Sequence, residues 1–551
     1  MKVTVSGPSL APRDYEFDSY VTVEEILQMV KDEMPYPIYL CKLDNNYRWL
    51  KHEVVHDAQI EFLDIRNTAC WSVYQNSLSL VYMKAVHDVL GEDAIVTVQN
   101  SFNKGLYTLI NKEFDYRSVV KIEDRMREIV NANLPIEKQY LKKDEAIALA
   151  KELKQEETVK LLKSIPNVRS VEIFSLVKEM QIFYGLLVPS TGYLQLFELI
   201  PYKDGILLRY PHPNDPNTIP EWEDQALLYE AFQEAKQWGK LLEISYVDDV
   251  NEIVKANKVR DMFMLQEALH EKRISNIADR ICRTHKRVVL ICGPSSSGKT
   301  TFAKRLIVQL RVNGYKTMYM GTDDYFKESH EAPYDENGER DYESIRAIDT
   351  KLFVNNLKGL LAGEMVDLPR YEFATQSKVF GERFTQISED TIIVIEGIHA
   401  LNHLLTEGID DNWKYKIYIS PFTPLSVDHH NRIMTTDCRL LRRIVRDHQF
   451  RNWSCKQTID TWPKVRAGED NNIFPFHSEA DTFFNSNCIY ELNVLKKYAE
   501  PMLKEIKRSE PEYAEAQRLL SFLRFFQTIE DTSDIVNNSI IREFIGGSIM
   551  V

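Results

Sequence analysis

The sequence predicts a multidomain α/β protein whose C-terminal half contains a parallel sheet with helices on both faces. At 551 residues the chain is longer than one hydrophobic core supports, which predicts three or four domains. After Lys286, apolar β-branched segments such as RVVLIC and TIIVIEG alternate with helical segments. Strands of this kind are buried on both faces, which is the pattern of a parallel sheet between two layers of helices.

The composition is that of a folded globular protein, with 44% hydrophobic and 27% charged residues. No apolar run approaches the ~20 residues needed to span a bilayer, and the first residues lack a signal-peptide core, so we expect a cytoplasmic protein. Seven scattered cysteines without a CxxC pair indicate neither a zinc site nor a disulfide framework. The net charge of -14 argues against nucleic-acid binding by the whole surface, because phosphate neutralisation needs basic residues.

The chain divides by pattern into five parts. Residues 1–65 combine short apolar strands with one helical stretch and predict a small α+β module. Residues 66–240 predict a second α+β module, in which Pro- and Gly-rich strands follow helices. Residues 241–285 predict a helical connector, and residues 286–500 contain the parallel sheet. Residues 501–551 predict a helical tail that docks on the body of the protein.

The segment GPSSSGKT matches GxxxxGK[ST], directly after a predicted buried strand and at the start of a helix. In this context the loop amides and the helix N-terminus cradle nucleotide phosphates, Lys299 reaches the β and γ oxygens, and Thr300 binds magnesium. The two flanks disfavour the alternative, a chance turn between strand and helix. The predicted ATP-binding residues here are Gly293, Pro294, Ser295, Ser296, Ser297, Gly298, Lys299, Thr300 and Thr301.

Carboxylates follow two neighbouring strands. The strand TIIVIEG ends in Glu396, which can give magnesium a second oxygen ligand, although a lone Glu can also merely cap a strand. Asp323 and Asp324 follow the strand KTMYMG, at the carboxyl edge of the sheet. One of them is a candidate general base for phosphoryl transfer to a hydroxyl, and two turn-forming Asp residues are the alternative. Together with the loop, these residues predict an ATP-dependent phosphotransferase that uses Mg²⁺.

The segment 432–466 is basic, with nine Lys/Arg and three Asp, a net charge of +6. Arg439, Arg443 and Arg446 lie at helical spacing on one face, with Arg442 beside them. Such a face can clamp transferring phosphate and exclude water as a lid, and a solvated basic helix is the alternative.

Motifs within residues 286–500 resemble, in order, the uridine kinase (uridine-cytidine kinase) branch of P-loop kinases. DDYF resembles the family's D-S-F-Y, LPRYEF its I-P-x-Y-D-F, and RRIVRDHQFR its lid R-R-x-x-R-D-x-x-x-R. The resemblance implies that Asp323 deprotonates the 5′-hydroxyl of a nucleoside and that Tyr371 forms a wall of the nucleoside pocket. It also implies phosphate-facing roles for Arg443, Arg446 and Arg451.

The resemblance says less about which molecule accepts the phosphoryl group. DYESIRAID resembles the segment that holds the ribose hydroxyls, which places Glu343 at the family's Asp position, with Asp341 as the other possibility. The family's base-reading His falls on Gln376, and a lid Arg falls on Trp453. Glutamine can still recognise an amide-like base edge, so a nucleoside is one expected acceptor and another sugar or polyol is the second.

The front half resembles other families. Residues 1–65 are similar to a TGS domain of β-grasp fold, and residues 66–240 to the editing domain of threonyl-tRNA synthetases, most clearly at YGLLVPSTGY. The metal- or substrate-gripping positions of that editing family match Asn76, Leu80, Phe183 and Leu187, so no ester hydrolysis is expected there.

Three functions follow as hypotheses. The whole arrangement, including the C-terminal SIIREFIGGS, resembles bacterial TGS-containing nucleoside kinases, whose partners would be ATP and a small-molecule acceptor. A kinase of another small alcohol is the second hypothesis. A nucleotide-gated regulatory or RNA-binding protein is the third, but residues 1–65 carry a net charge of -6, which repels phosphate backbones. The choice of ATP over GTP and the formation of a homo-oligomer stay open.

Overall fold

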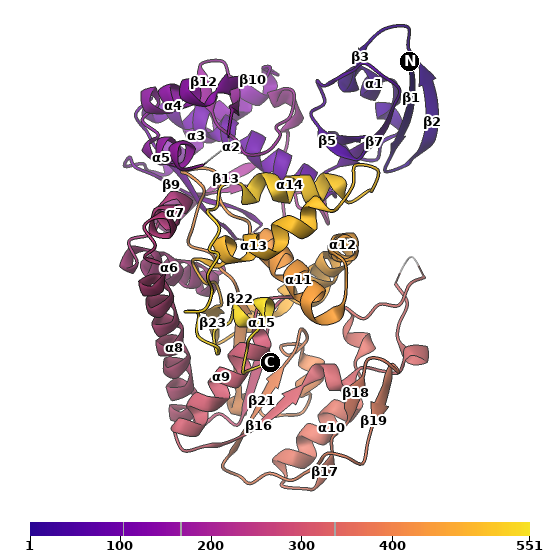
Figure 1. The fold of residues 1–551 in the computed structure, drawn as a ribbon, viewed down its shortest axis with the longest axis vertical. Coiled ribbons are helices and arrows are strands. Elements are labelled where there is room, and N and C mark those ends of the chain that lie inside the picture. The colour runs from indigo at the N-terminus through magenta and orange to yellow at the C-terminus, as the bar shows by residue number, and fades with distance from the viewer. Residues whose placement is uncertain (103, 166–167, 336–337) are drawn as a thin grey trace.

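The computed structural model describes residues 1–102, 104–165, 168–335 and 338–551. Two modules of the front half lie at one end of the elongated molecule, and the sheet of the C-terminal half lies towards the other end (Figure 1). The long helix α8 (Val259–Arg283) runs along one side between these two ends. None of the described helices is both long enough and apolar enough to cross a membrane.

The N-terminal module is a five-stranded sheet with one helix. Its strand order is β2-β1-β7-β4-β5, in which β1 and β7 are parallel and the other pairs antiparallel. Helix α1 begins at a capping box between Thr22 and Glu25 and buries four aliphatic residues against the sheet. The relation to TGS domains stays a prediction. The elements are β1 (Lys2–Gly7), β2 (Leu10–Glu16), β3 (Val21–Thr22), α1 (Val23–Val30), β4 (Ile38–Leu43), β5 (Asn46–Arg48), β6 (Glu53–Val54) and β7 (Ala58–Asp64).

The second module packs two sheets, β13-β14-β9-β8 and β10-β11-β12, around the buried helix α2. Leu80, Phe183 and Leu187 lie in its core and offer no ligand atom, so these editing-family positions cannot grip a metal. The elements are α2 (Thr68–Leu90), β8 (Val96–Phe102), β9 (Gly105–Ile110), α3 (Tyr116–Asn131), β10 (Glu137–Lys142), α4 (Lys143–Glu152), α5 (Glu156–Ser164), β11 (Ser170–Leu176), β12 (Glu179–Gln181), β13 (Glu198–Tyr202), β14 (Gly205–Arg209), α6 (Ala226–Leu241) and α7 (Val247–Lys255).

The C-terminal half contains the predicted parallel sheet, with strand order β16-β21-β15-β22-β23 and every neighbouring pair parallel. Phe302 of α9 packs with Val289 in one core cluster, whereas Phe353 of α10 packs with Leu290 in another. Adjacent residues of a strand point to opposite faces, so helices cover both faces, as predicted. The elements are β15 (Val288–Cys292), α9 (Lys299–Val312), β16 (Lys316–Gly321), α10 (Thr350–Leu361), β21 (Thr391–Glu396), β22 (Lys414–Ser420) and β23 (Thr482–Asn485).

Further elements surround this sheet. Two small antiparallel pairs, β17 with β20 and β18 with β19, lie between α10 and β21 in the chain. The C-terminal segment is only partly helical, because α14 ends at Leu523 and most of the remaining chain has no regular structure. The elements are β17 (Val366–Asp367), β18 (Arg370–Glu372), β19 (Ser377–Val379), β20 (Phe384–Thr385), α11 (Thr435–Arg451), α12 (Cys455–Asn472), α13 (Glu491–Lys504), α14 (Tyr513–Leu523) and α15 (Arg542–Ile545).

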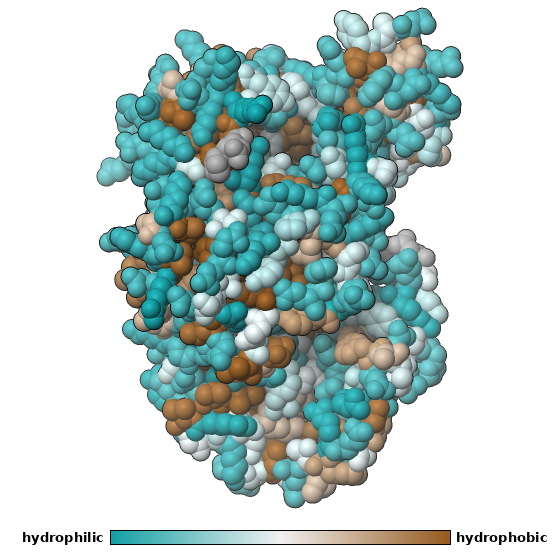
Figure 2. Space-filling model, viewed as in Figure 1, coloured by the Kyte–Doolittle hydropathy of each residue, from teal (hydrophilic) through white to brown (hydrophobic). Residues whose placement is uncertain are grey.

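The surface drawn in Figure 2 is mostly hydrophilic, and hydrophobic residues form separate patches on it. Some exposed apolar residues belong to the neighbouring helices α8 and α9: Met264, Leu265, Val308 and Val312. A predominantly polar surface is expected from the high content of charged residues.

Candidate functional site

The loop from Gly293 to Thr300 connects β15 to α9, at the carboxyl edge of the sheet. A Cβ atom at Gly293 would lie 2.2 Å from the Ile419 carbonyl oxygen, so only glycine fits between these strands. Gly298 has φ +84°, a conformation that favours glycine, and it leads directly into the first residue of α9. The N–H groups of the α9 N-terminus therefore lie at the end of the loop, where an anion is stabilised.

Helix α11 packs against this loop and supports it through arginine side chains. Arg439 donates to the Ser295 carbonyl oxygen at 3.2 Å, and Arg442 donates to the Ser296 carbonyl oxygen at 3.4 Å. Arg443 donates to the Ser295 hydroxyl at 2.8 Å. The basic helix thus touches the loop along its length, which its sequence alone does not show.

A buried glutamate completes this support. Glu469 of α12 accepts a hydrogen bond from the Ser295 N–H at 3.0 Å and pairs with both Arg439 and Arg466. Burial alone would raise the pKa of Glu469, but the two guanidinium groups hold it below its usual value. Sequence reasoning missed this residue. Its spacing of three from Arg466 along a helix was the one local signal.

The predicted magnesium ligands lie together. The Thr300 hydroxyl donates to the Glu396 carboxylate at 3.3 Å, and Tyr319, which sequence reasoning did not single out, donates to the same oxygen at 2.9 Å. Burial raises the pKa of Glu396 to about 7, and Lys299 opposes this shift. A hydroxyl and a carboxylate are oxygen donors of the kind that Mg²⁺ prefers, so the residues fit this ion.

The raised pKa of Glu396 predicts that magnesium binding depends on pH. Below pH 7 the proton competes with the cation, so we expect the apparent Mg²⁺ affinity to fall by up to roughly tenfold between pH 7 and pH 6. Above pH 7 the carboxylate is charged and the affinity levels off. Titrating Mg²⁺ into the ATP-bound protein at pH 6, 7 and 8 measures this. In Glu396→Gln the step at pH 7 should vanish, and a step that persists would assign it to another group.

The two aspartates after β16 have different surroundings. Asp324 accepts hydrogen bonds from Arg383 at 2.7 Å and from the Tyr371 N–H at 3.3 Å, so it holds the β18 hairpin in place. Asp323 is exposed at the surface, but the protein atoms around its carboxyl group still desolvate it and raise its pKa. The positive charges of Lys299 and Arg451 oppose this shift. Asp323 is therefore the aspartate available to an acceptor.

The structure corrects the predicted lid. Arg439 and Arg442 are 1% and 0% exposed, and Arg442 pairs with Glu491 at 2.5 Å, so these two side chains are fixed supports rather than parts of a moving clamp. Arg443, Arg446 and Arg451 instead gather around Asp447, with nitrogen–oxygen distances of 3.2, 3.1 and 3.4 Å. Only these three of the predicted helix arginines remain as candidates to meet phosphate.

Aromatic side chains line the region next to Asp323. The ring centroids of Phe326 and Tyr371 are 5.7 Å apart, those of Tyr371 and Phe373 5.1 Å, and those of Phe326 and Tyr342 6.1 Å. Tyr371 is buried, whereas Phe373 is 66% exposed. Such a group offers flat apolar surface to a ring-shaped ligand.

The other residues predicted to bind the acceptor molecule differ in position: one lies near the helix arginines and two lie in turns. Burial raises the pKa of Glu343 to about 7, with Arg443 opposing the shift, which places this carboxyl near the helix arginines. Asp341 accepts from the backbone N–H groups of Glu343 and Ser344 at 3.1 and 3.2 Å and so stabilises its own turn. Gln376 is exposed at φ +52° in the turn between β18 and β19. Glu343 is therefore better placed than Asp341 to meet an acceptor.

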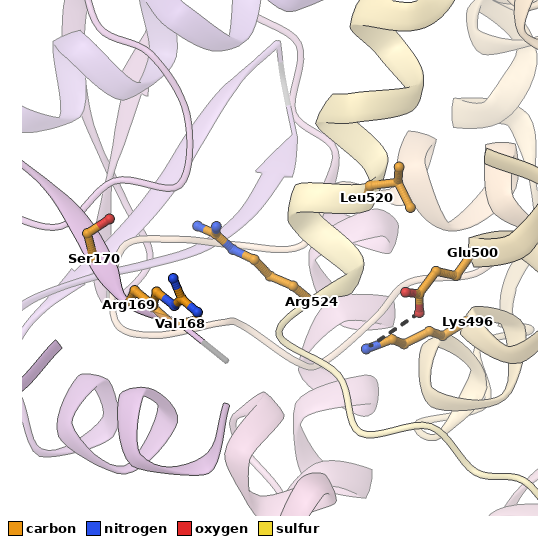
Figure 3. Close-up of a pocket in the computed structure, with 7 residues that line it drawn as sticks. All are labelled: Val168, Arg169, Ser170, Lys496, Glu500, Leu520 and Arg524. Carbon is orange, nitrogen blue, oxygen red and sulfur yellow. Dashed lines mark ion pairs between the residues drawn. The ribbon is translucent and has the colours of Figure 1, made fainter. Parts of the chain in front are cut away.

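A separate cavity of about 410 Å³ lies between the start of β11 and helices α13 and α14. In Figure 3, Arg524 points towards Arg169 and Ser170, while the Lys496–Glu500 ion pair lies on the other side. None of the predicted site residues lines this cavity, so it is distinct from the loop site. Its lining residues are Val168, Arg169, Ser170, Lys496, Glu500, Leu520 and Arg524.

Comparison with known proteins gives a match over the C-terminal half. A sequence model described as "Phosphoribulokinase / Uridine kinase family" matches residues 288–490. Uridine kinases of Macrococcus caseolyticus and Staphylococcus aureus strain JH9 are 28% and 29% identical over 195 residues, which cover 35% of this chain and 85% and 84% of the relatives. A solved structure titled as a possible uridine kinase from Bacillus stearothermophilus has a TM-score of 0.27 at 20% identity and covers 39% of this chain and 98% of its own. The family match confirms the predicted resemblance for this region, and the front modules lie outside it.

Proposed function

We propose that this chain, whose residues 288–490 form a P-loop kinase region of the phosphoribulokinase/uridine kinase family, transfers the γ-phosphoryl group of ATP to the 5′-hydroxyl of a nucleoside. The observation that carries the proposal is the meeting of three groups at one sheet edge. The loop follows β15, Glu396 ends β21, and Asp323 follows β16, and these three strands are neighbours. Parallel strands bring their carboxyl ends together, so donor, metal and acceptor groups share one site.

Each of these residues has a chemical task in the proposed transfer. The loop amides and Lys299 hold the phosphates of ATP, and Thr300 and Glu396 would hold Mg²⁺, which neutralises charge on the phosphate oxygens when bound. The Asp323 carboxylate accepts the proton of the attacking hydroxyl. Arg443, Arg446 and Arg451 stabilise the charge that develops on the transferred group.

The aromatic residues favour a nucleoside over a small polyol. Tyr371 and Phe373 present rings at 5.1 Å from each other, beside Phe326, and a base can stack on such surfaces while a polyol cannot. Glu343 is the residue that would bind the sugar hydroxyls, since Asp341 is held by its own turn. Gln376, in the exposed turn, is the proposed contact to the base edge.

The test is ADP release by the full chain against a panel of nucleosides, sugars, polyols and hydroxy acids. We expect turnover with one or more nucleosides. If every nucleoside is inert while another alcohol turns over, the second hypothesis replaces this one. If ATP binds and no alcohol turns over, the protein is a nucleotide-gated binding protein instead.

Removing the Tyr371 ring should weaken acceptor binding selectively. Because stacking of one base on an aromatic side chain contributes ~1–3 kcal/mol, Tyr371→Ala should raise the KM for the nucleoside about tenfold or more and leave the KM for ATP unchanged. Phe384→Ala is the control for the loss of an aromatic ring, since Phe384 lies in β20, is 66% exposed and belongs to none of the ring contacts above. Equal effects of both variants would contradict a stacking role for Tyr371.

A further inference from the structure

The end of the chain lies against the nucleotide loop. Residues Ser539–Gly546, here called the strap, include the short helix α15 and lie close to α9 and α11 in the middle of the molecule (Figure 1). The Ile540 Cγ2 atom lies only 2.6 Å from the place where a Cβ of Gly298 would be. Ile540, Ile541 and Phe544 are fully buried in the same core cluster as α9. The strap therefore packs against the loop and against helix α9.

One strap carboxylate occupies donors at the start of α9. Glu543 accepts hydrogen bonds from the Thr301 N–H at 3.3 Å and from the Thr301 hydroxyl at 2.7 Å. Thr301 follows directly on Lys299 and Thr300, so its N–H is one of the unpaired amides at the helix N-terminus that attract an anion. A carboxylate at this position takes the place that a nucleotide phosphate would use.

The charges around Glu543 make the two occupants incompatible. Burial raises the pKa of Glu396 most, and the negative charges of Asp323 and Glu543 raise it further. The Glu543 carboxylate therefore lies close to the proposed metal ligand. A triphosphate bound to the same loop would add several negative charges beside both carboxylates. Either the nucleotide or Glu543 can use the Thr301 donors.

Contacts outside the loop hold the strap in place. Arg542 donates to the carbonyl oxygens of Thr532 and Ile535, each at 2.7 Å. Ser539 donates at 2.5 Å to Glu267 of α8, which also pairs with Arg305 of α9 at 3.2 Å. These contacts keep Glu543 near Thr301 without a nucleotide and would keep the strap nearby after Glu543 is displaced.

We propose that the strap is an autoinhibitory segment, in which Glu543 competes with the phosphates of the nucleotide for Thr301. Nucleotide binding then requires Glu543 to leave its position, and anything that draws the strap away raises nucleotide affinity. The proposal rests on nucleotide binding at the loop, as in the proposed function.

The experiment measures the Kd of ATP with Mg²⁺ for the full chain by calorimetry. Glu543→Gln keeps the size of the side chain and removes its charge, so we expect a Kd roughly tenfold lower than that of the wild type. Glu543→Ala, which also removes the acceptor, should lower the Kd at least as far. The matched control is Glu530→Gln, which neutralises a 75% exposed glutamate that precedes the strap and should leave the Kd unchanged. Hydrogen exchange of residues 539–546 should become faster when ATP is added to the wild type.

Two results would overturn the inference: an equal or higher Kd in both Glu543 variants, or ATP-induced protection of the strap. Lys299→Ala separates this failure from that of the proposed function. If the wild type binds ATP and Lys299→Ala does not, while the Glu543 variants match the wild type, only the inference fails. If neither the wild type nor a Glu543 variant binds ATP, the proposed function fails as well. Binding by the Glu543 variants alone supports strong autoinhibition.

Discussion

Replacing Asp323 by Asn is expected to lower turnover by at least ~10²-fold while ATP affinity stays close to that of the wild type. The amide keeps the size of the side chain but cannot accept the proton of the attacking hydroxyl. The loss should therefore appear in kcat, with little change in the KM for ATP, because in the proposed transfer Asp323 contacts the acceptor rather than the donor. Initial rates of ADP release at saturating acceptor measure this effect.

Asp324→Asn is the matched control for this substitution. Asp324 binds Arg383 and the Tyr371 N–H, so its loss should loosen the β18 hairpin and act mainly on the KM for the acceptor. A kcat of Asp323→Asn equal to the wild type would remove Asp323 from the mechanism. A larger loss of kcat in Asp324→Asn than in Asp323→Asn would assign the base to Asp324.

The parts of the site that the sequence predicts are those whose signals are local. The loop has glycines at fixed offsets, a buried strand before it and a helix after it, and each of these follows from neighbouring residues. Glu396 and Asp323 follow from the same rule, because a carboxylate after an apolar strand falls at the edge of the sheet. The parallel order of the strands then brings these groups together without any information about distant contacts.

The parts that the sequence does not predict depend on contacts between distant segments. Glu469 meets Ser295 across 174 positions, and Glu543 meets Thr301 across 242. Neither glutamate stands out within its own helix, since an exposed glutamate at the same spacing would look alike. The fold alone decides which charges become buried.

The basic helix α11 is a second example of what sequence alone cannot predict. Helical spacing correctly places Arg439, Arg443 and Arg446 along one stretch of α11, but it cannot tell a buried arginine from one that faces substrate. The deciding partners, Glu469 and Glu491, come from α12 and α13. A buried guanidinium needs such a carboxylate, so the two fixed arginines could be recognised only once their partners were placed.

Replacing Glu469 by Ala should therefore cause the largest loss of stability among the site residues. The substitution leaves Arg439 and Arg466 without their shared carboxylate in a buried position, and removing one partner of such a group costs about 3–5 kcal/mol. It also frees the Ser295 N–H, so the loop loses one of its supports. Urea unfolding of the full chain, followed by a probe in the C-terminal half, should show the shift in midpoint.

Glu500→Ala provides the comparison, because the partly exposed Glu500 pairs with Lys504 at 2.5 Å and with Lys496 at 3.9 Å, and solvent-accessible pairs contribute about 0–1 kcal/mol each. A shift for Glu469→Ala no larger than this control would contradict the role of Glu469 as the buried partner of two arginines. Restoring the acid as Glu469→Asp should recover only part of the stability, since the shorter side chain cannot meet Arg439, Arg466 and the Ser295 N–H at once. ATP affinity should follow the same order, Glu469→Ala below Glu469→Asp below wild type, because Glu469 fixes the Ser295 position of the loop proposed to bind ATP, and a loosened loop must be ordered when the nucleotide binds.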